Sequence, residues 1–198
     1  MINSKGTVGP GGSAVPLTMV LAGLVLVGVI IVALTAPLEA LLGENRYALE
    51  AALHGVSAGL FMIAATIGLF QGYRLVNGTI QHPGQLEFGS LMNAFLSFMT
   101  ILFGNRIYIF YRAKGGPRTY FLEASPAVHK IFFEFKEFTA LFTLPLAVAA
   151  SFLFLFYREQ VLRSRGLRTI AAFLLALTFC YLIVAFGLGA AITKLRAL

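Results

Sequence analysis

Long apolar intervals alternate with short charged segments along the chain. Five intervals contain no Asp, Glu, Lys or Arg, and each holds 18 or more residues. These intervals are 6–38, 51–73, 88–105, 138–157 and 169–193. A helix rises about 1.5 Å per residue and the hydrocarbon core of a bilayer is about 30 Å thick, so each interval is long enough, or nearly so, to cross it. The pattern predicts five transmembrane helices.

The apolar intervals favour helices over the strands of a membrane barrel. A barrel strand alternates in polarity over about ten residues, whereas these runs are continuous. We therefore expect an all-α integral membrane protein, with one domain over 15–198 that is a bundle of five transmembrane helices. The first 16 residues contain four Gly and two Pro, and residues 1–14 predict a flexible N-terminal arm. The first apolar interval is longer than the core of a typical signal peptide, which favours a helix over a cleaved leader.

The charged segments predict the connections between these helices. We expect a loop over 36–55, with the residues 43–45 as the turn into the second helix. Pro126 is suited to the start of the fourth helix, and Pro145 predicts a kink within it. The basic segment 157–168 is expected to be the loop before the fifth helix.

Composition supports the membrane assignment. Hydrophobic residues make up 59% of the 198 positions and charged residues 12%, against about 25% charged in a soluble domain. The net charge is +7, but the basic residues lie at helix ends, so we expect contact with anionic lipid headgroups and not with nucleic acid. Basic residues divide six against nine between the two sides, which leaves the orientation open. We expect a multi-pass protein of a prokaryotic-type inner membrane.

Small and polar residues predict contacts between the helices. Gly55 and Gly59 lie four residues apart in the second helix, and Gly187 and Gly189 lie near the end of the fifth. Small residues let helix backbones approach closely in lipid, so we expect these glycines at helix–helix contacts. Asn93 is a polar residue within the apolar third helix and is expected to form an interhelical hydrogen bond.

The segment 129–138, HKIFFEFKEF, places charged residues beside large apolar ones at the start of the fourth helix. At about 100° per residue it forms one polar and one apolar arc. The polar arc contains His129, Lys130, Phe133, Glu134, Lys136 and Glu137, and the apolar arc contains Ile131, Phe132, Phe135 and Phe138. Either the helix begins among the headgroups on its phenylalanine face, or the polar arc faces the bundle.

A polar arc that faces the bundle would indicate a functional site, because charged side chains inside a membrane are costly and commonly functional. The polar arc would then pair with Arg106 of the third helix. Arg106, Glu134, Lys136 and Glu137 form a candidate intramembrane charge cluster that could frame a ligand or a proton route.

The three histidines are the candidate metal ligands. His54 and His129 lie on helices that run in the same direction, and two such imidazoles could ligate one haem b between helices two and four. Arg106, Arg112 and Lys130 lie on the same side of the predicted membrane and could neutralise the haem propionates. A quinone between helices two to four is the alternative ligand.

Each histidine also has a simpler interpretation. His54 lies about four residues inside its charge-free interval and His129 about nine outside the next, a difference in depth near 20 Å. Arg46, Glu50 and His54 are spaced to form a polar ladder along one helix face. His129 could be an interfacial helix residue, and His82 is expected in a solvated loop.

Apolar helices with histidines near their ends, together with the basic stretch from Arg106 to Arg118, resemble the membrane-embedded b-type cytochromes. The resemblance rests on His54 and His129 and on no motif that spans the chain. It implies electron transfer between a quinol and a partner redox protein, with His54 and His129 as the axial haem ligands.

Two other functions remain open. The small size and the smooth apolar helices suit a non-catalytic subunit of a larger membrane complex. A small transporter is the third alternative, suggested by Pro145 and the charge cluster. Whether the chain is an enzyme is left open, because it contains no Asp, no cysteine pair and no nucleophile or phosphate-binding motif. The expected partners are the lipid bilayer and other membrane subunits or a redox protein.

Overall fold

The computed structural model describes residues 17–42, 46–80 and 82–197, so the predicted arm over 1–14 lies outside the described residues. Every regular element in these ranges is helical. The elements are α1 (Leu17–Leu42), α2 (Arg46–Val76), α3 (Gly84–Arg112), α4 (Pro117–Ala124), the π-helical segment η2 (Val128–Phe133), α5 (Glu134–Arg163) and α6 (Arg165–Ala197).

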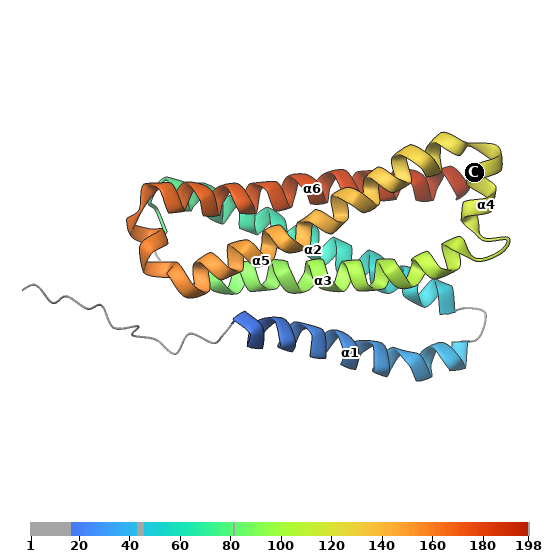
Figure 1. Cartoon of the computed structure of the whole chain (residues 1–198), viewed down its shortest axis with the longest axis horizontal. Coiled ribbons are helices and arrows are strands. Elements are labelled where there is room, and N and C mark those ends of the chain that lie inside the picture. The colour runs from blue at the N-terminus through green and yellow to red at the C-terminus, as the bar shows by residue number, and fades with distance from the viewer. Residues whose placement is uncertain (1–16, 43–45, 81, 198) are drawn as a thin grey trace, which may run out of the picture.

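Four long helices form the body of the molecule (Figure 1). Helix α2 packs on α3 and α6, and α5 packs on the same two helices. Successive helices run in opposite directions, which is the up-down arrangement of a four-helix bundle. Helix α1 lies outside this group and contacts α2 and α3 (Figure 1). The described part of the chain therefore consists of a four-helix bundle with one added helix.

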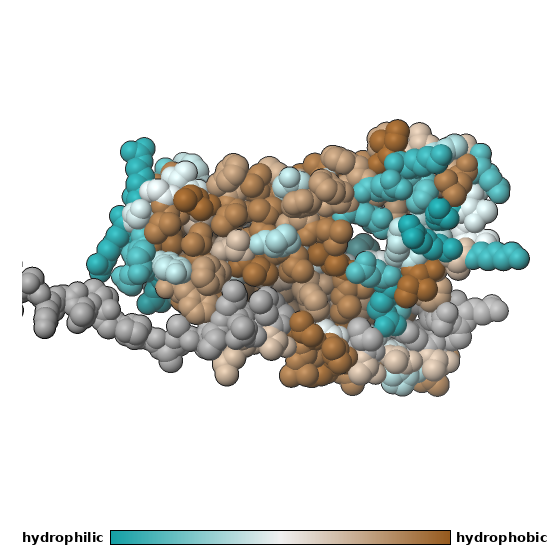
Figure 2. All heavy atoms as spheres, in the orientation of Figure 1, coloured by the Kyte–Doolittle hydropathy of each residue, from teal (hydrophilic) through white to brown (hydrophobic). Residues whose placement is uncertain are grey.

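The same four helices are long and apolar enough to cross a membrane. The qualifying segments are Tyr47–Val76, Gly84–Arg112, Val128–Arg163 and Arg165–Leu195. Figure 2 shows a mainly hydrophobic surface along the bundle, with hydrophilic residues gathered toward its two ends. In α1 only the shorter piece Val25–Pro37 qualifies as an apolar helix. The all-α class is confirmed, and the membrane crossings, including a fifth by α1, stay a prediction.

Close packing between α2 and α6 depends on Gly72. A Cβ at Gly72 would lie 3.4 Å from the Cα and the carbonyl oxygen of Ala172, so the two backbones approach closely there. The predicted contacts at Gly55 and Gly59 are wrong, because a Cβ at either position would meet no described atom within 4 Å. Gly187 likewise faces open space. The rotation of each helix about its own axis decides which glycines face a neighbour.

The helices extend further than the charge pattern predicts. Most of the expected loop over 36–55 is helical, because α1 continues to Leu42 and α2 begins at Arg46. The expected basic loop over 157–168 is mostly helical, and the helix breaks at Ser164, whose side chain accepts a hydrogen bond from the Leu167 backbone N–H at 3.4 Å. The first segment is rich in Ala, Leu and Glu and the second in Arg and Leu, and these residues favour helix whether or not lipid surrounds them.

The irregular point in α5 is not at its proline. Pro145 lies inside the helix, and the non-helical backbone angles occur at Tyr157, with φ −126° and ψ 22°. Pro126 is helical and begins the continuous run through η2 into α5, as its sequence position predicts. The departure at Tyr157 precedes the charged last turns of α5.

Candidate functional site at the His129 end of the bundle

A tight turn after α3 folds α4 back on the end of the bundle. Gly115 has φ +75°, a conformation that residues with a Cβ rarely adopt. A Cβ at Gly116 would lie 2.6 Å from the carbonyl oxygen of Phe110, so this position also requires glycine. The turn lets Phe121 of α4 pack in a buried cluster with Tyr111 of α3 and Ile192 of α6. Three helices thereby meet at one end.

His129 lies at the centre of this end and is 3% exposed. Its Nδ1 lies 2.8 Å from the hydroxyl of Tyr111 in α3. The Nε of Arg118 in α4 donates a hydrogen bond to His129 Nε2 at 3.2 Å. The imidazole therefore joins α3, α4 and η2.

These contacts fix the proton on the ring. Because Nε2 accepts from a guanidinium, a neutral imidazole must carry its proton on Nδ1 and donate it to the Tyr111 oxygen. The Tyr111 hydroxyl proton is then available to another acceptor. A metal at Nε2 would first have to displace Arg118.

An aromatic stack lies against His129. The rings of Tyr111 and Phe133 are parallel, with centroids 4.2 Å apart and an interplanar angle of 1°. Tyr108 lies 6.0 Å from Phe133 on the same stack. Two cations border it: Arg112 lies over Tyr108 at 4.6 Å, and the Lys136 Nζ is 5.5 Å from the Phe133 ring centre. The site therefore combines flat apolar rings with positive charge.

An apolar cavity of about 210 Å³ adjoins the stack between η2 and α6. Its lining residues are Val128, Phe132, Leu188, Ala191, Ile192 and Leu195. Val128 and Ile192 also pack on Tyr111, so they separate the cavity from the aromatic stack. Phe132 and Leu195 are exposed and mark the side on which the cavity opens.

Part of the polar arc of the fourth predicted helix faces the bundle. Ile131, Phe132, Phe135 and Phe138 of the apolar arc are all exposed, whereas His129 is buried. Lys136 and Glu137 are half-buried, and Lys130 and Glu134 are exposed. Within this arc, His129 contacts Tyr111 and Arg118. The arc was predicted to pair with Arg106, but the described carboxylate in contact with Arg106 belongs to Glu50.

The Glu50–Arg106 pair joins α2 to α3. Arg106 Nε donates to Glu50 Oε1 at 2.7 Å, and the Glu50 side chain is 2% exposed. The predicted ladder from Arg46 through Glu50 to His54 stays a prediction, and the described partner of Glu50 lies on another helix. The Arg46 side chain lies outside the described residues.

His54 also faces α3, deeper in the bundle. Its Nδ1 lies 3.0 Å from the backbone carbonyl oxygen of Thr100. Gly104 makes room for the ring, since a Cβ there would lie 3.2 Å from His54 Cε1. Asn93 donates to the carbonyl oxygens of Ala64 in α2 at 3.2 Å and of Gly89 at 2.9 Å, which confirms its predicted interhelical bond.

The structure does not bring His54 and His129 together. Their partners Thr100 and Tyr111 are eleven residues apart on α3, about 16 Å along the helix. Two axial ligands of one iron must lie about 4 Å apart, twice a metal–nitrogen bond of about 2 Å. The described geometry does not fit a haem shared by these two side chains. Among residues 17–42, 46–80 and 82–197, no three His, Cys, Asp or Glu side chains converge on one point.

The three residues predicted to neutralise haem propionates contact other side chains or are exposed. Arg106 contacts Glu50, Arg112 lies over Tyr108, and Lys130 is exposed. His82 is exposed in the turn before α3, as expected. These positions do not form one anion-binding group with the two histidines.

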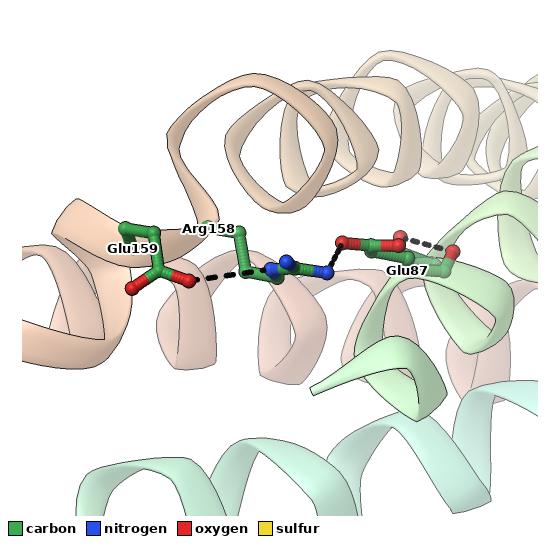
Figure 3. Close-up of polar contacts among 4 residues, drawn as sticks. Glu87, Arg158 and Glu159 are labelled. Atoms are coloured by element: carbon green, nitrogen blue, oxygen red, sulfur yellow. Dashed lines mark hydrogen bonds and ion pairs between the residues drawn. The ribbon is translucent and has the colours of Figure 1, made fainter. Parts of the chain in front are cut away.

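The opposite end of the bundle carries a separate ion-pair group. Arg158 of α5 donates to Glu87 of α3 at 2.9 Å and lies 3.7 Å from Glu159 (Figure 3). The Arg158 side chain is 45% exposed, so water competes for these contacts. This group links the helix ends and has no contact with the His129 end.

For four residues of the site, the sequence did not predict the contact with a histidine. Tyr111, Arg118 and Phe133 surround His129, and Gly104 accommodates His54. The usable signal was the pair of glycines at 115 and 116, which predicts a sharp reversal that returns Arg118 toward the end of α3.

Comparison with known proteins gave no match. No family model, no curated protein and no solved structure matches the chain. The functional argument therefore rests on the residues of the chain itself.

Proposed function

We propose that the protein is a multi-pass membrane protein that binds a quinone at its His129 end, as one subunit of a larger redox complex. Helices α2, α3, α5 and α6 cross the bilayer, and α1 provides a fifth crossing. The quinone ring binds beside Val128 and Ile192, with its isoprenoid tail directed toward lipid past Phe132 and Leu195. Partner subunits supply and remove its electrons.

The membrane part of the proposal is supported by helix length and by surface polarity. The four long helices meet the length and hydropathy expected of membrane spans. Exposed apolar side chains also cover α1, including Leu26, Val29 and Leu34. Lipid or a partner helix would cover these side chains in place of water.

The quinone part is carried by one observation: an apolar cavity of about 210 Å³ next to a buried Tyr–His–Arg group and an aromatic stack. Ligand sites are mainly apolar, with few polar groups that fix orientation. A quinone ring is flat, and the residues that line the cavity are all apolar and suit its faces and its tail, while Tyr111 lies behind Val128 and Ile192. A haem shared by His54 and His129 lacks comparable support.

The test uses cavity filling and a neighbouring control. Ala190 and Ala191 are both exposed, but only Ala191 is among the residues that line the cavity. Binding of a short-chain ubiquinone to the purified protein in detergent is measured by isothermal titration calorimetry. We expect Ala191→Phe to weaken binding at least tenfold and Ala190→Phe to leave it unchanged.

The proposal fails if the unmodified protein shows no saturable quinone binding. It also fails if Ala191→Phe binds as tightly as the unmodified protein. A reduced-minus-oxidised absorption spectrum of the same preparation tests for haem b independently, because a bound haem gives a Soret band that shifts on reduction.

A non-catalytic subunit is the second candidate, and the packing of α1 favours it. Gly28 lies directly against Phe98 of α3, while most other described side chains of α1 are exposed. A helix held at so few points is suited to share its remaining faces with another subunit. Chemical cross-linking in native membranes, followed by purification through this chain, would identify such a subunit.

A further inference from the structure

Basic residues outnumber acidic ones at the end of the bundle opposite His129. Five arginines lie there, and two of them contact the local carboxylates Glu87 and Glu159. These two are Arg158 and Arg163. The other three, Arg74, Arg165 and Arg168, contact no carboxylate among the residues that the structure describes. This end therefore retains positive charge that protein groups do not neutralise.

Two of these arginines converge on one turn between α2 and α3. Arg74 donates from Nη2 to the carbonyl oxygen of Thr79 at 3.1 Å. Arg168 lies on the other flank, because a Cβ at Gly78 would be 3.1 Å from its Nη1. The φ of +68° at Gly78 shapes the turn so that both guanidinium groups fit against it.

Protein groups do not fully satisfy the Arg168 guanidinium. Its Nε is buried and has no hydrogen-bond partner within the described ranges. A buried donor without an acceptor is unfavourable, and a guanidinium binds planar or tetrahedral oxyanions through two parallel hydrogen bonds. An oxyanion beside Arg74 and Arg168 would supply the missing acceptors.

Apolar residues lie close to the two arginines in sequence. Leu75 and Ala171 are fully buried beneath them in one hydrophobic cluster. Tyr73 and Ile170, their near neighbours in sequence, are exposed. An ion from water would leave these exposed apolar side chains uncovered, whereas the acyl chains of a phospholipid would cover them.

We propose that Arg74 and Arg168 bind the phosphate of an anionic phospholipid at the membrane boundary, opposite the quinone end. The headgroup lies over the turn at Gly78 and Thr79, and the acyl chains run along Tyr73 and Ile170. This inference shares the membrane placement of the proposed function and is independent of quinone binding, so either can fail alone.

The test compares lipids on the intact protein. Native mass spectrometry from detergent measures retention of phosphatidylglycerol and of phosphatidylcholine, each added at the same concentration. We expect at least fivefold greater retention of phosphatidylglycerol, lost in the double variant Arg74→Gln/Arg168→Gln. The charge-matched control Arg163→Gln/Lys114→Gln removes two exposed cations and should retain the preference.

Equal retention of the two lipids by the unmodified protein would overturn the proposal without any variant. An equal loss of the preference in both double variants would overturn it as well, because net charge alone would then explain binding. Inorganic phosphate provides the third arm. Displacement of phosphatidylglycerol by millimolar phosphate would assign the site to a free anion and refute the lipid.

Discussion

The guanidinium of Arg106 donates to Glu50 at 2.7 Å across the interface of α2 and α3, and the carboxylate side chain is 2% exposed. Removal of one partner from a buried pair takes away an interaction that offsets the cost of burying the other charge. We expect Glu50→Ala to lower the free energy of unfolding by about 3 kcal/mol. Titration with SDS in mixed micelles, followed by circular dichroism, measures this change. A double variant Glu50→Met/Arg106→Met should recover part of the loss, and no recovery would contradict the pair as its cause.

The ion pair at the other end predicts a contrasting result. Arg158 contacts Glu87 and Glu159, but its side chain is 45% exposed. Exposed ion pairs contribute about 1 kcal/mol or less. Arg158→Ala should therefore change the free energy of unfolding by less than about 1 kcal/mol in the same titration. An effect as large as that of Glu50→Ala would show that exposure is a poor guide in this bundle.

The close approach of α2 and α6 predicts a position that tolerates no large side chain. Gly72→Leu places new atoms against the backbone of Ala172, and overpacking of this kind costs about 1 to 3 kcal/mol. Gly59→Leu is the matched control in the same helix, because its Cβ meets no described atom within 4 Å. Thermal unfolding in detergent should show a lower Tm for Gly72→Leu alone. Equal losses in both variants would contradict the assigned interface.

The tautomer of His129 predicts that loss of the Tyr111 hydroxyl oxygen lowers the free energy of unfolding. Tyr111→Phe keeps the ring stack with Phe133 and removes the acceptor of the buried Nδ1–H. We expect a loss of about 1 to 3 kcal/mol in the free energy of unfolding, the usual effect of an unsatisfied buried donor. Tyr120→Phe is the control, since Tyr120 is exposed. A neutral outcome at Tyr111 would mean that water replaces the hydroxyl.

The fifth crossing predicts opposite sides for the two termini. In a Cys180→Ser background, single cysteines at Ser4 and Ala197 can be labelled with a membrane-impermeant maleimide on sealed vesicles. An odd number of crossings makes only one of the two accessible from outside. Labelling of both from the same side would leave four crossings and place α1 on the membrane surface.

The charge-free intervals located the long helices but not their ends. Lipid excludes charged side chains, so such intervals mark the apolar middle of each helix. Helix formation continues beyond that limit wherever residues favour it, as in the charged last turns of α5 up to Arg163. The boundary of a helix and the boundary of a membrane are separate properties of the sequence.

The site was harder to predict than the helices. A constant step of about 100° per residue placed Phe133, an apolar residue, on the polar arc and gave no reason for its position there. The segment Val128–Phe133 is π-helical, so that step does not hold there, and Phe133 stacks on Tyr111. His129 contacts Tyr111, 18 positions away, and Arg118, 11 positions away. These contacts form only when the turn after α3 folds α4 back on the bundle.

The packing order of the helices bears on how the chain assembles. Among the four long helices, α2 with α3, α3 with α5, and α5 with α6 are neighbours in sequence, and only α2 with α6 joins distant parts of the chain. Hairpins between successive helices close short loops and form early. We therefore expect the contact of Gly72 with Ala172 to form last, after α6 has been synthesised. Synthesis stopped before α6 would leave the surface of α2 around Gly72 without the neighbour that covers it.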